Sequence, residues 1–320
     1  MTTRRSTFAI TAGLALALIG GAAFAEYPEK PVRMVIPYGQ GGATDTIGRM
    51  VAGPLEEALG VPVVVTNQPG AGGAVGLASA FQAAPDGYTI AVGSDSSLSA
   101  RPLMTDSGYD ISSMAPIARA VESPMAFVVR EDSDIDNIDE LLERIEADDL
   151  TWSSPGVGSG PFLGAETFFN QQGVSALHVT SDSAGNSIVK LLSGEVEMVS
   201  VVGSNVVGMI GDPEQPVKVI GVASEDRWMR LPDSATFAEQ GYDFTRPVWF
   251  GFVAPAGTPQ EAIDRLSAEI EAIMTGEEAA ELLEKFHMTA AYQDPAEFAA
   301  QIEAEQDTLA DVLDAIGMAK

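Results

Sequence analysis

The chain has 320 residues, with 17 Lys and Arg against 46 Asp and Glu, which gives a formal net charge of −29. So acidic a protein repels phosphate backbones and anionic lipid surfaces, and nucleic acid and anionic membranes are therefore poor candidate partners. The sequence contains no Cys. This excludes disulfides, thiolate metal sites and cysteine nucleophiles, and it is compatible with an oxidising compartment.

The first 25 residues predict an export signal. Arg4 and Arg5 form a positive segment, residues 8–21 form a small apolar core, and Ala23 and Ala25 match the small-x-small rule for cleavage. The apolar run is shorter than the roughly 20 residues that a membrane-spanning helix needs. We therefore expect cleavage after Ala25 and a periplasmic protein.

Apolar β-branched runs then alternate with helical patterns, which is typical of α/β domains with largely parallel sheets. The expected strands are 32–36, 61–66, 88–93, 125–130, 151–154, 176–180, 196–202, 217–223 and 249–254. The helical patterns are 47–59, a short one that carries Leu77 and Phe81, 161–172, 187–192, and one after each of Thr258 and Asp294. Thr258 and Asp294 each begin a capping-box sequence in which Pro follows and Glu comes third.

The order of these elements predicts two lobes. After the strand 125–130 the chain becomes acidic over 131–139, and we place the first crossing between lobes there. The strand 249–254 returns the chain to the first lobe. The expected boundaries are 26–124 and 247–320 for lobe 1 and 125–246 for lobe 2. Two-lobed receptors that close on a ligand have this organisation.

Three glycine-rich junctions between a strand and a helix are the candidate binding sites. Such a junction presents unpaired N–H groups and the positive end of a helix dipole to an anion. The candidate ligands in the first junction, residues 37–45, are Tyr38, Gln40, Gly41, Gly42 and Asp45. A tight turn without a ligand is the alternative explanation. Because two carboxylates repel each other, we expect Asp45 to cap the helix or to orient a water.

The second junction, residues 67–76, contributes Ala71. Its glycines nearly match the dinucleotide-binding fingerprint, with Asp95 downstream, but the spacing is one residue too long, so a dinucleotide is a weak alternative. Ser94, at the end of the following strand, is a further candidate ligand.

The third junction, residues 153–160, belongs to the second lobe. It is not a nucleophile elbow, because Val157 and Pro161 stand where glycines are required. We expect His178 to be structural. No metal-ligand spacing or catalytic set is found, so we expect no metal and no cofactor. The candidate ligands here are Ser154, Gly156, Gly158 and Ser159.

The ordered motifs resemble the periplasmic substrate-binding receptors of tripartite tricarboxylate transporters, also called Bug-type receptors. Residues 27–33 look like the family's Y-P-x-K-P-I-R, and residues 37–45 fit P-[FY]-x-x-G-G-x-x-D. Residues 63–76 fit V-V-V-x-N-x-P-G-A-G-G-x-x-G. Further matches are P-D-G-Y at 85–88, S-x-x-R-x-x-x-L-P-D-x-x-T at 224–236, and W-x-G followed by A-P-A-G-T-P at 249–259. The set covers nearly all of the mature chain.

This resemblance implies an α/β, two-lobed periplasmic-binding-protein fold (Venus flytrap, type II) with a parallel-rich sheet in each lobe. It implies a small carboxylate ligand, held by amides, hydroxyls and waters from both lobes, and an integral-membrane permease as partner. We therefore expect a monomeric receptor and not an enzyme. An exported enzyme that acts on a carboxylate or ester is the alternative from another class.

The chain departs from the family pattern at three places in lobe 2. Pro161 replaces a common His, residues 180–183 replace P-Y-K-G, and residues 200–201 replace F-D. Ser181 and Asp182 occupy the variable distal position, so we expect them to set which ligand is preferred. A bulkier residue at Gly42 should reduce affinity more than stability, since it blocks the approach to the backbone.

Overall fold

The structure is a computed structural model that describes residues 27–40, 43–147 and 150–320. The expected export signal and its cleavage site lie outside the described residues, as do Gly41 and Gly42 of the first junction.

The chain alternates strands and helices through most of its length. The strands are β1 (Val32–Ile36), β2 (Val63–Asn67), β3 (Thr89–Ser94), β4 (Met114–Arg130), β5 (Thr151–Ser153), β6 (Leu177–His178), β7 (Met198–Val202), β8 (Val217–Val222), β9 (Pro247–Pro255) and β10 (Thr289–Gln293). The helices are α1 (Ala43–Leu59), α2 (Ala74–Phe81), α3 (Arg101–Met104), α4 (Ile138–Glu146), α5 (Gly160–Gln172), α6 (Ala184–Leu192), α7 (Gln260–Thr275), α8 (Glu277–Lys285) and α9 (Pro295–Ala315).

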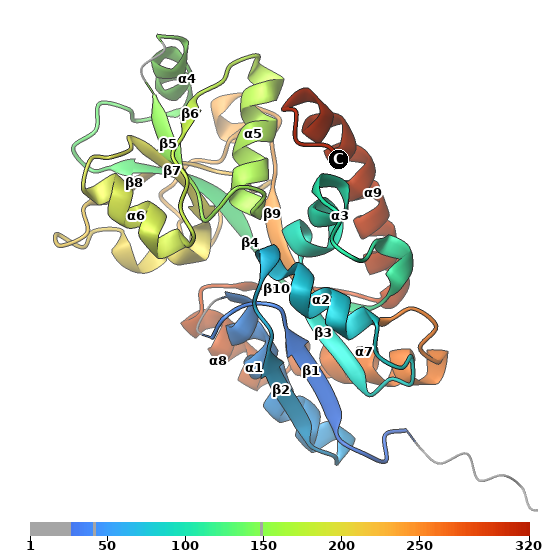
Figure 1. Cartoon of the computed structure of the whole chain (residues 1–320). Helices are drawn as coiled ribbons and strands as arrows, with labels where there is room; N and C mark the ends of the chain where they lie inside the picture. The colour runs from blue at the N-terminus through green and yellow to red at the C-terminus, as the bar shows by residue number, and fades with distance from the viewer. Residues whose placement is uncertain (1–26, 41–42, 148–149) are drawn as a thin grey trace, which may run out of the picture.

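The elements form two lobes that share strands, as Figure 1 shows. The strand order is β2-β1-β3-β9-β4-β7-β5-β6, with β10 and β8 also paired to β4. Each lobe has a parallel set at its centre: β1 pairs with β2 and β3, and β5 pairs with β6 and β7. The strands β4, β8, β9 and β10 add antiparallel pairs, so the sheet is mixed.

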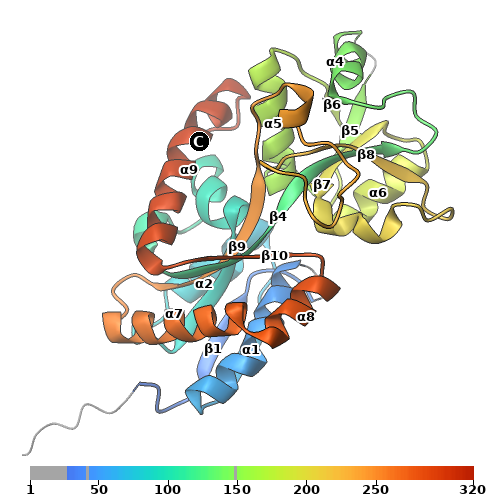
Figure 2. The same cartoon turned by 180° about the vertical axis from the view of Figure 1, so that it is seen from behind.

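Helices cover both faces of the sheet in the first lobe. Alternate residues of β1 point to opposite faces, as strand geometry requires. Met34 packs in the core under α1, α7 and α8, whereas Val35 packs in the core under α2 and α9. Figure 2, from behind, shows α1, α7 and α8 together on one side. In the second lobe α4 and α5 cover one face and α6 covers the other.

Two long strands connect the lobes. The strand β4 pairs with β9 from Met114 to Pro124, and with β7 and β8 from Met125 onward. The strand β9 pairs with β3 and β4 in lobe 1, and the residue before it, Arg246, is hydrogen-bonded through its backbone to Ala223 and Met125 of lobe 2. The backbone therefore crosses between the lobes within β4 and at the start of β9, and it is hydrogen-bonded at both places.

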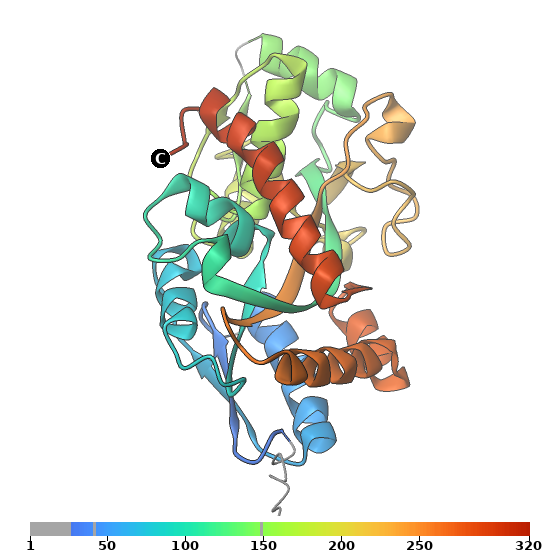
Figure 3. The ribbon, with the colours of Figure 1, turned by 90° about the vertical axis from the view of Figure 1, so that its right-hand side faces the viewer.

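The last helix contacts both lobes. The N-terminal half of α9 buries Phe298 and Ile302 in the core of the first lobe, and its C-terminal half buries Leu309 and Leu313 in the core of the second. Figure 3 shows α9 running along the side of the molecule from one lobe to the other.

Most of the expected elements are present, but some expectations were wrong. Asp294 caps α9 in a capping box with Glu297, as expected. Thr258 does not cap α7: its hydroxyl donates to the carbonyl of Pro255 at 2.8 Å, and α7 begins only at Gln260. The strand β4 begins at Met114 and not at Met125, because backbone pairing with β9 extends it through Pro116 and Pro124.

Candidate functional site

The first two predicted junctions meet at the carboxyl ends of the parallel strands in lobe 1, where open α/β sheets bind ligands. Tyr38 follows β1 and donates from its hydroxyl to the carbonyl of Gly72, in the loop after β2, at 3.1 Å. Ser94 ends β3 and caps the next helical segment, η2 (Asp95–Ala100). The parallel register of β1 with β2 and β3 brings these three loops to one edge. Gln40 is exposed at the same edge.

The loop after β2 is strained at a predicted ligand position. Ala71 has φ +46° and lies between Gly70 at φ +144° and Gly72 at φ +62°. The left-handed conformation costs a residue with a side chain about 1–2 kcal/mol. Backbone strain of this kind is retained mainly at functional sites, where the surrounding structure enforces it.

Asp45 is buried and joins the first two junctions. Its carboxylate accepts from Arg49 Nε at 3.0 and 3.1 Å and from Asn67 Nδ2 at 2.8 Å. Asn67 also donates to the carbonyl of Tyr38 at 3.0 Å. The Asp45 charge is therefore balanced by Arg49, and the ends of β1 and β2 are held together. Its roles as a cap or a water-orienting group stay predictions.

In the third junction the Ser159 hydroxyl is placed to donate to a ligand. Ser159 caps α5, where its oxygen accepts from the N–H of Phe162 at 3.3 Å, so its own O–H can donate to a ligand. Ser154 is fully buried, and its hydroxyl lies 3.0 Å from Nε2 of His178. Burial lowers the pKa of His178, which favours the neutral ring. Gly156 and Gly158 lie between the two serines.

The third junction faces lobe 1. The segment η2 contacts α5. A Cβ added to Gly160, the first residue of α5, would lie 2.5 Å from Asp95 Oδ2, and Met104 packs on Gly158. The structure therefore brings the loops after β3 and β5 together across the two lobes.

Ser181 and Asp182 lie in lobe 2. The hydroxyl of Ser153 donates to that of Ser181 at 3.3 Å, which connects the third junction to this segment. The two residues also line an open hollow of about 580 Å³ with Thr180, Asn186, Val189, Lys190 and Glu195. The other two departures from the family pattern contact each other: the hydroxyl of Ser200 donates to the carbonyl of Pro161 at 2.8 Å.

A buried charge cluster lies behind the site, where the strands cross. Arg246 contacts Asp95 at 3.4 Å and Glu305 at 2.8 Å, so two carboxylates share one guanidinium. Complete burial raises the pKa of Asp95 to about 7; Arg246 opposes the rise, whereas Glu305 adds to it. Trp249 and Ser99 donate to Glu305 at 2.9 and 3.0 Å.

The comparisons with known proteins identify the family. A family profile described as "Tripartite tricarboxylate transporter family receptor" matches residues 47–318. The chain belongs to this receptor family. A UPF0065 protein of Bordetella pertussis is 31% identical over 277 residues, which cover 85% of this chain and 85% of that protein.

Solved structures agree in fold. The periplasmic binding protein BugD has a TM-score of 0.78 at 29% identity, over 92% of this receptor and 100% of that chain. MatC from Rhodopseudomonas palustris, solved with bound malate, has a TM-score of 0.78 at 26% identity, over 90% of this receptor and 100% of that chain. The predicted family and the two-lobed α/β fold are confirmed. The family and these neighbours are periplasmic solute-binding receptors.

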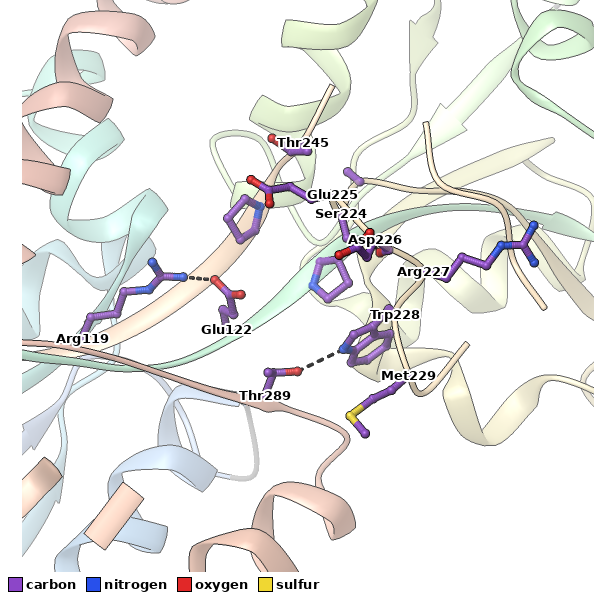
Figure 4. A pocket seen from close by; sticks show the side chains of 13 residues that line it. Arg119, Glu122, Ser224, Glu225, Asp226, Arg227, Trp228, Met229, Thr245 and Thr289 are labelled. Carbon is purple, nitrogen blue, oxygen red and sulfur yellow. Dashed lines mark hydrogen bonds and ion pairs between the residues drawn. The ribbon is translucent and has the colours of Figure 1, made fainter. Parts of the chain in front are cut away.

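The receptor has a larger pocket of about 620 Å³ near the strand crossing, shown in Figure 4. Its charged lining consists of Arg119, Glu122, Glu225, Asp226 and Arg227. Both arginines are already paired, Arg119 with Glu122 and Arg227 with Glu239. No predicted ligand residue lines this pocket. Its surplus of carboxylates disfavours an anion, so we do not place the ligand there.

Two further findings concern the described residues alone. They contain no group of three or more His, Asp or Glu placed to hold a metal ion. None of their helices combines the length and the apolar character that crossing a bilayer requires.

Two charged side chains of the receptor were not predicted as parts of the site. Asp95 was expected only as the acid of a weak dinucleotide alternative, although it contacts Arg246 of the other lobe. Arg101, which begins α3 beside the strained loop, was not among the candidate residues. The one sequence feature that could have indicated Arg101 is its position seven residues after Ser94, in a segment otherwise poor in basic residues.

Proposed function

We propose that this receptor binds a small carboxylate between its lobes and delivers it to the integral-membrane permease of a tripartite tricarboxylate-type transporter. The observation that carries the proposal is the meeting of the predicted loops at facing edges of two lobes, with Ala71 held in a strained conformation. Neutral amide and hydroxyl donors can hold an anion without a cluster of basic residues. This explains how a strongly acidic protein could bind an anion locally.

The change of strand partner supports the proposed lobe boundaries. In β4 the pairing changes between Pro124 and Met125, and Pro247 begins β9 opposite Pro124. We assign 26–124 and 247–320 to lobe 1 and 125–246 to lobe 2, with the end of α9 packed on lobe 2. A ligand that bridges both lobes shifts the population toward the closed form. The permease would then dock on a surface made by both lobes of a receptor monomer.

The class of ligand follows from the family and from the site. MatC was solved with malate, and the donors near Tyr38 and Ser159 suit a carboxylate. The thermal-shift screen that tests the proposal uses malate, adipate, citrate, glutamate and benzoate, with glucose and spermidine as controls. A ligand at 100 times its dissociation constant adds about 2.7 kcal/mol of stability. Stabilisation by glucose or spermidine alone would overturn the proposal.

The alternative is an exported enzyme, and the contact between Ser154 and His178 is its one structural support. A serine nucleophile needs an exposed hydroxyl and an oriented base. Ser154 is fully buried, and the His178 ring packs between Trp152 and Phe162. We therefore interpret the pair as a structural hydrogen bond. Incubation with p-nitrophenyl acetate and with each carboxylate tests this, and turnover that is lost in Ser154→Ala would establish the enzyme instead.

Export is the last part of the proposal. The expected cleavage after Ala25 would leave Glu26 as the first residue of the mature chain. Intact mass measurement of the periplasmic fraction checks this directly. A protein that retains residues 1–25 there would contradict cleavage.

A further inference from the structure

Among the residues that the structure describes, Arg101 is a cation near the proposed site without an ion-pair partner. Most described Arg and Lys side chains have a carboxylate within 4.0 Å. Arg101 has no such pair among the residues that the structure describes. Arg33, Lys285 and Lys320 also have no pair in this part of the chain, but they lie on β1, at the end of α8 and at the C-terminus.

The Arg101 guanidinium lies against the strained loop. A Cβ added to Gly72 would be only 1.7 Å from Nη2 and 2.6 Å from Cζ of Arg101. The guanidinium therefore occupies the space that a side chain at position 72 would need. Gly72 follows Ala71, and both belong to the loop that ends β2. Arg101 is half-buried at this place.

The same guanidinium acts electrostatically on two tyrosines, Tyr38 of the first junction and Tyr109. Burial raises the pKa of Tyr38, and the Arg101 charge opposes this rise. Burial also raises the pKa of Tyr109, again opposed by Arg101. The Tyr38 hydroxyl donates to Gly72 at 3.1 Å. Tyr38, the loop after β2 and Arg101 thus form one surface at the carboxyl edge of the sheet.

We propose that Arg101 binds the carboxylate of the ligand directly and makes the receptor select a charged ligand. This inference rests on the proposed function, and it names the residue that recognises the negative charge of the ligand. A guanidinium offers paired N–H donors in the plane of a carboxylate and keeps its charge under all physiological conditions. Because the net charge of the protein is strongly negative, the protein as a whole repels anions. A cation inside the site would favour the entry of an anionic ligand there.

A purely structural role for Arg101 makes a different prediction. Its stem could simply fill the space over Gly72, and removal would then lower stability and affect charged and neutral probes alike. Arg101→Met keeps the bulk and removes the charge. Arg101→Gln removes the charge and retains a donor, and Arg101→Lys keeps the charge without the planar fork. Arg33→Gln is the matched control, because it removes an equally unpaired charge near the N-terminal end of β1.

The experiment is calorimetric titration of wild type and variants with one probe, at low and high sodium chloride. The probe is whichever carboxylate of the thermal-shift screen (malate, adipate, citrate, glutamate or benzoate) raises the melting temperature of the wild type most. We expect Arg101→Gln and Arg101→Met to bind about 10- to 100-fold more weakly, as loss of a charge-assisted hydrogen bond implies. Arg101→Lys should lie between, and Arg33→Gln should bind within about twofold of wild type.

Salt dependence separates the charge from the packing. Wild-type affinity should fall with added salt, and Arg101→Met should show a weaker dependence, because screening acts on the lost charge pair. Charge-free variants that bind the probe within about twofold of wild type would overturn the role of Arg101 and leave the carboxylate receptor intact. A wild type that no carboxylate of the thermal-shift screen stabilises would overturn the proposed function together with this inference.

Discussion

At Gly160 the two lobes approach so closely that a single added methyl group should disturb their contact. This glycine is the first residue of α5 in lobe 2. A Cβ there would lie 2.5 Å from Oδ2 and 3.0 Å from Oδ1 of Asp95 in lobe 1. Asp95 cannot turn aside cheaply, because it is fully buried and contacts Arg246 at 3.4 Å. The substitution Gly160→Ala should therefore force the lobes apart locally.

The size of the effect follows from the cost of overpacking. An extra methyl group in a well-packed site costs about 1–3 kcal/mol. If the clash acts on the ligand-bound, closed arrangement, the apparent dissociation constant rises by the same free energy. That corresponds to a loss of affinity of about 5- to 150-fold. Lobe 2 itself should be little affected, since Ala is a better helix former than Gly.

Calorimetric titration with the best carboxylate of the screen measures this loss, and urea unfolding measures stability. Gly185→Ala on α6 is the matched control, because a Cβ there meets no atom within 4 Å. We expect the control to bind like wild type. Normal binding by a folded Gly160→Ala protein would refute the reasoning, since it would show that this contact plays no part in closure.

Three further predictions concern the site and its surroundings. Gly72→Ala should lower the free energy of unfolding by about 1–2 kcal/mol in urea titrations, because φ is +62° and the Arg101 guanidinium must move. The pKa of Asp95, raised from 3.8 to about 7, means that the folded state holds its proton more tightly. Stability should therefore fall as pH rises from about 4 to about 7, and Asp95→Asn should flatten this slope. Ser181→Ala and Asp182→Asn should reorder the ligands in a thermal-shift screen without abolishing carboxylate binding.

Local patterns in the sequence were sufficient for much of the fold. The β-branched run Val32–Ile36 and the alternation of strands with amphipathic helices predicted the parallel core of each lobe. The segment Met114–Pro124 was missed because its prolines disfavour a central strand. Register shifts after Pro116 and Arg119 let β9 pair along this segment, and β10 pairs with it from Arg119 to Glu122.

The part of the candidate site that could be predicted is the set of loops between strands and helices, because a local sequence pattern marks them. Glycine-rich junctions can be recognised from local composition, so Tyr38, Ala71 and Ser159 could be proposed from their positions after predicted strands. The contacts of Asp95 and Arg101 depend on which distant segments meet, and no local pattern encodes them. The family resemblance supplied the ligand class, which the residues alone left open.

The most direct test of the account is small-angle X-ray scattering of the purified receptor, without ligand and with the strongest-binding carboxylate at saturation. A ligand held between two lobes must favour their closed arrangement. The account therefore predicts a smaller radius of gyration with the carboxylate than without it, and no change with an equal concentration of glucose. An unchanged radius of gyration at saturation, confirmed by calorimetry on the same sample, would contradict binding between the lobes.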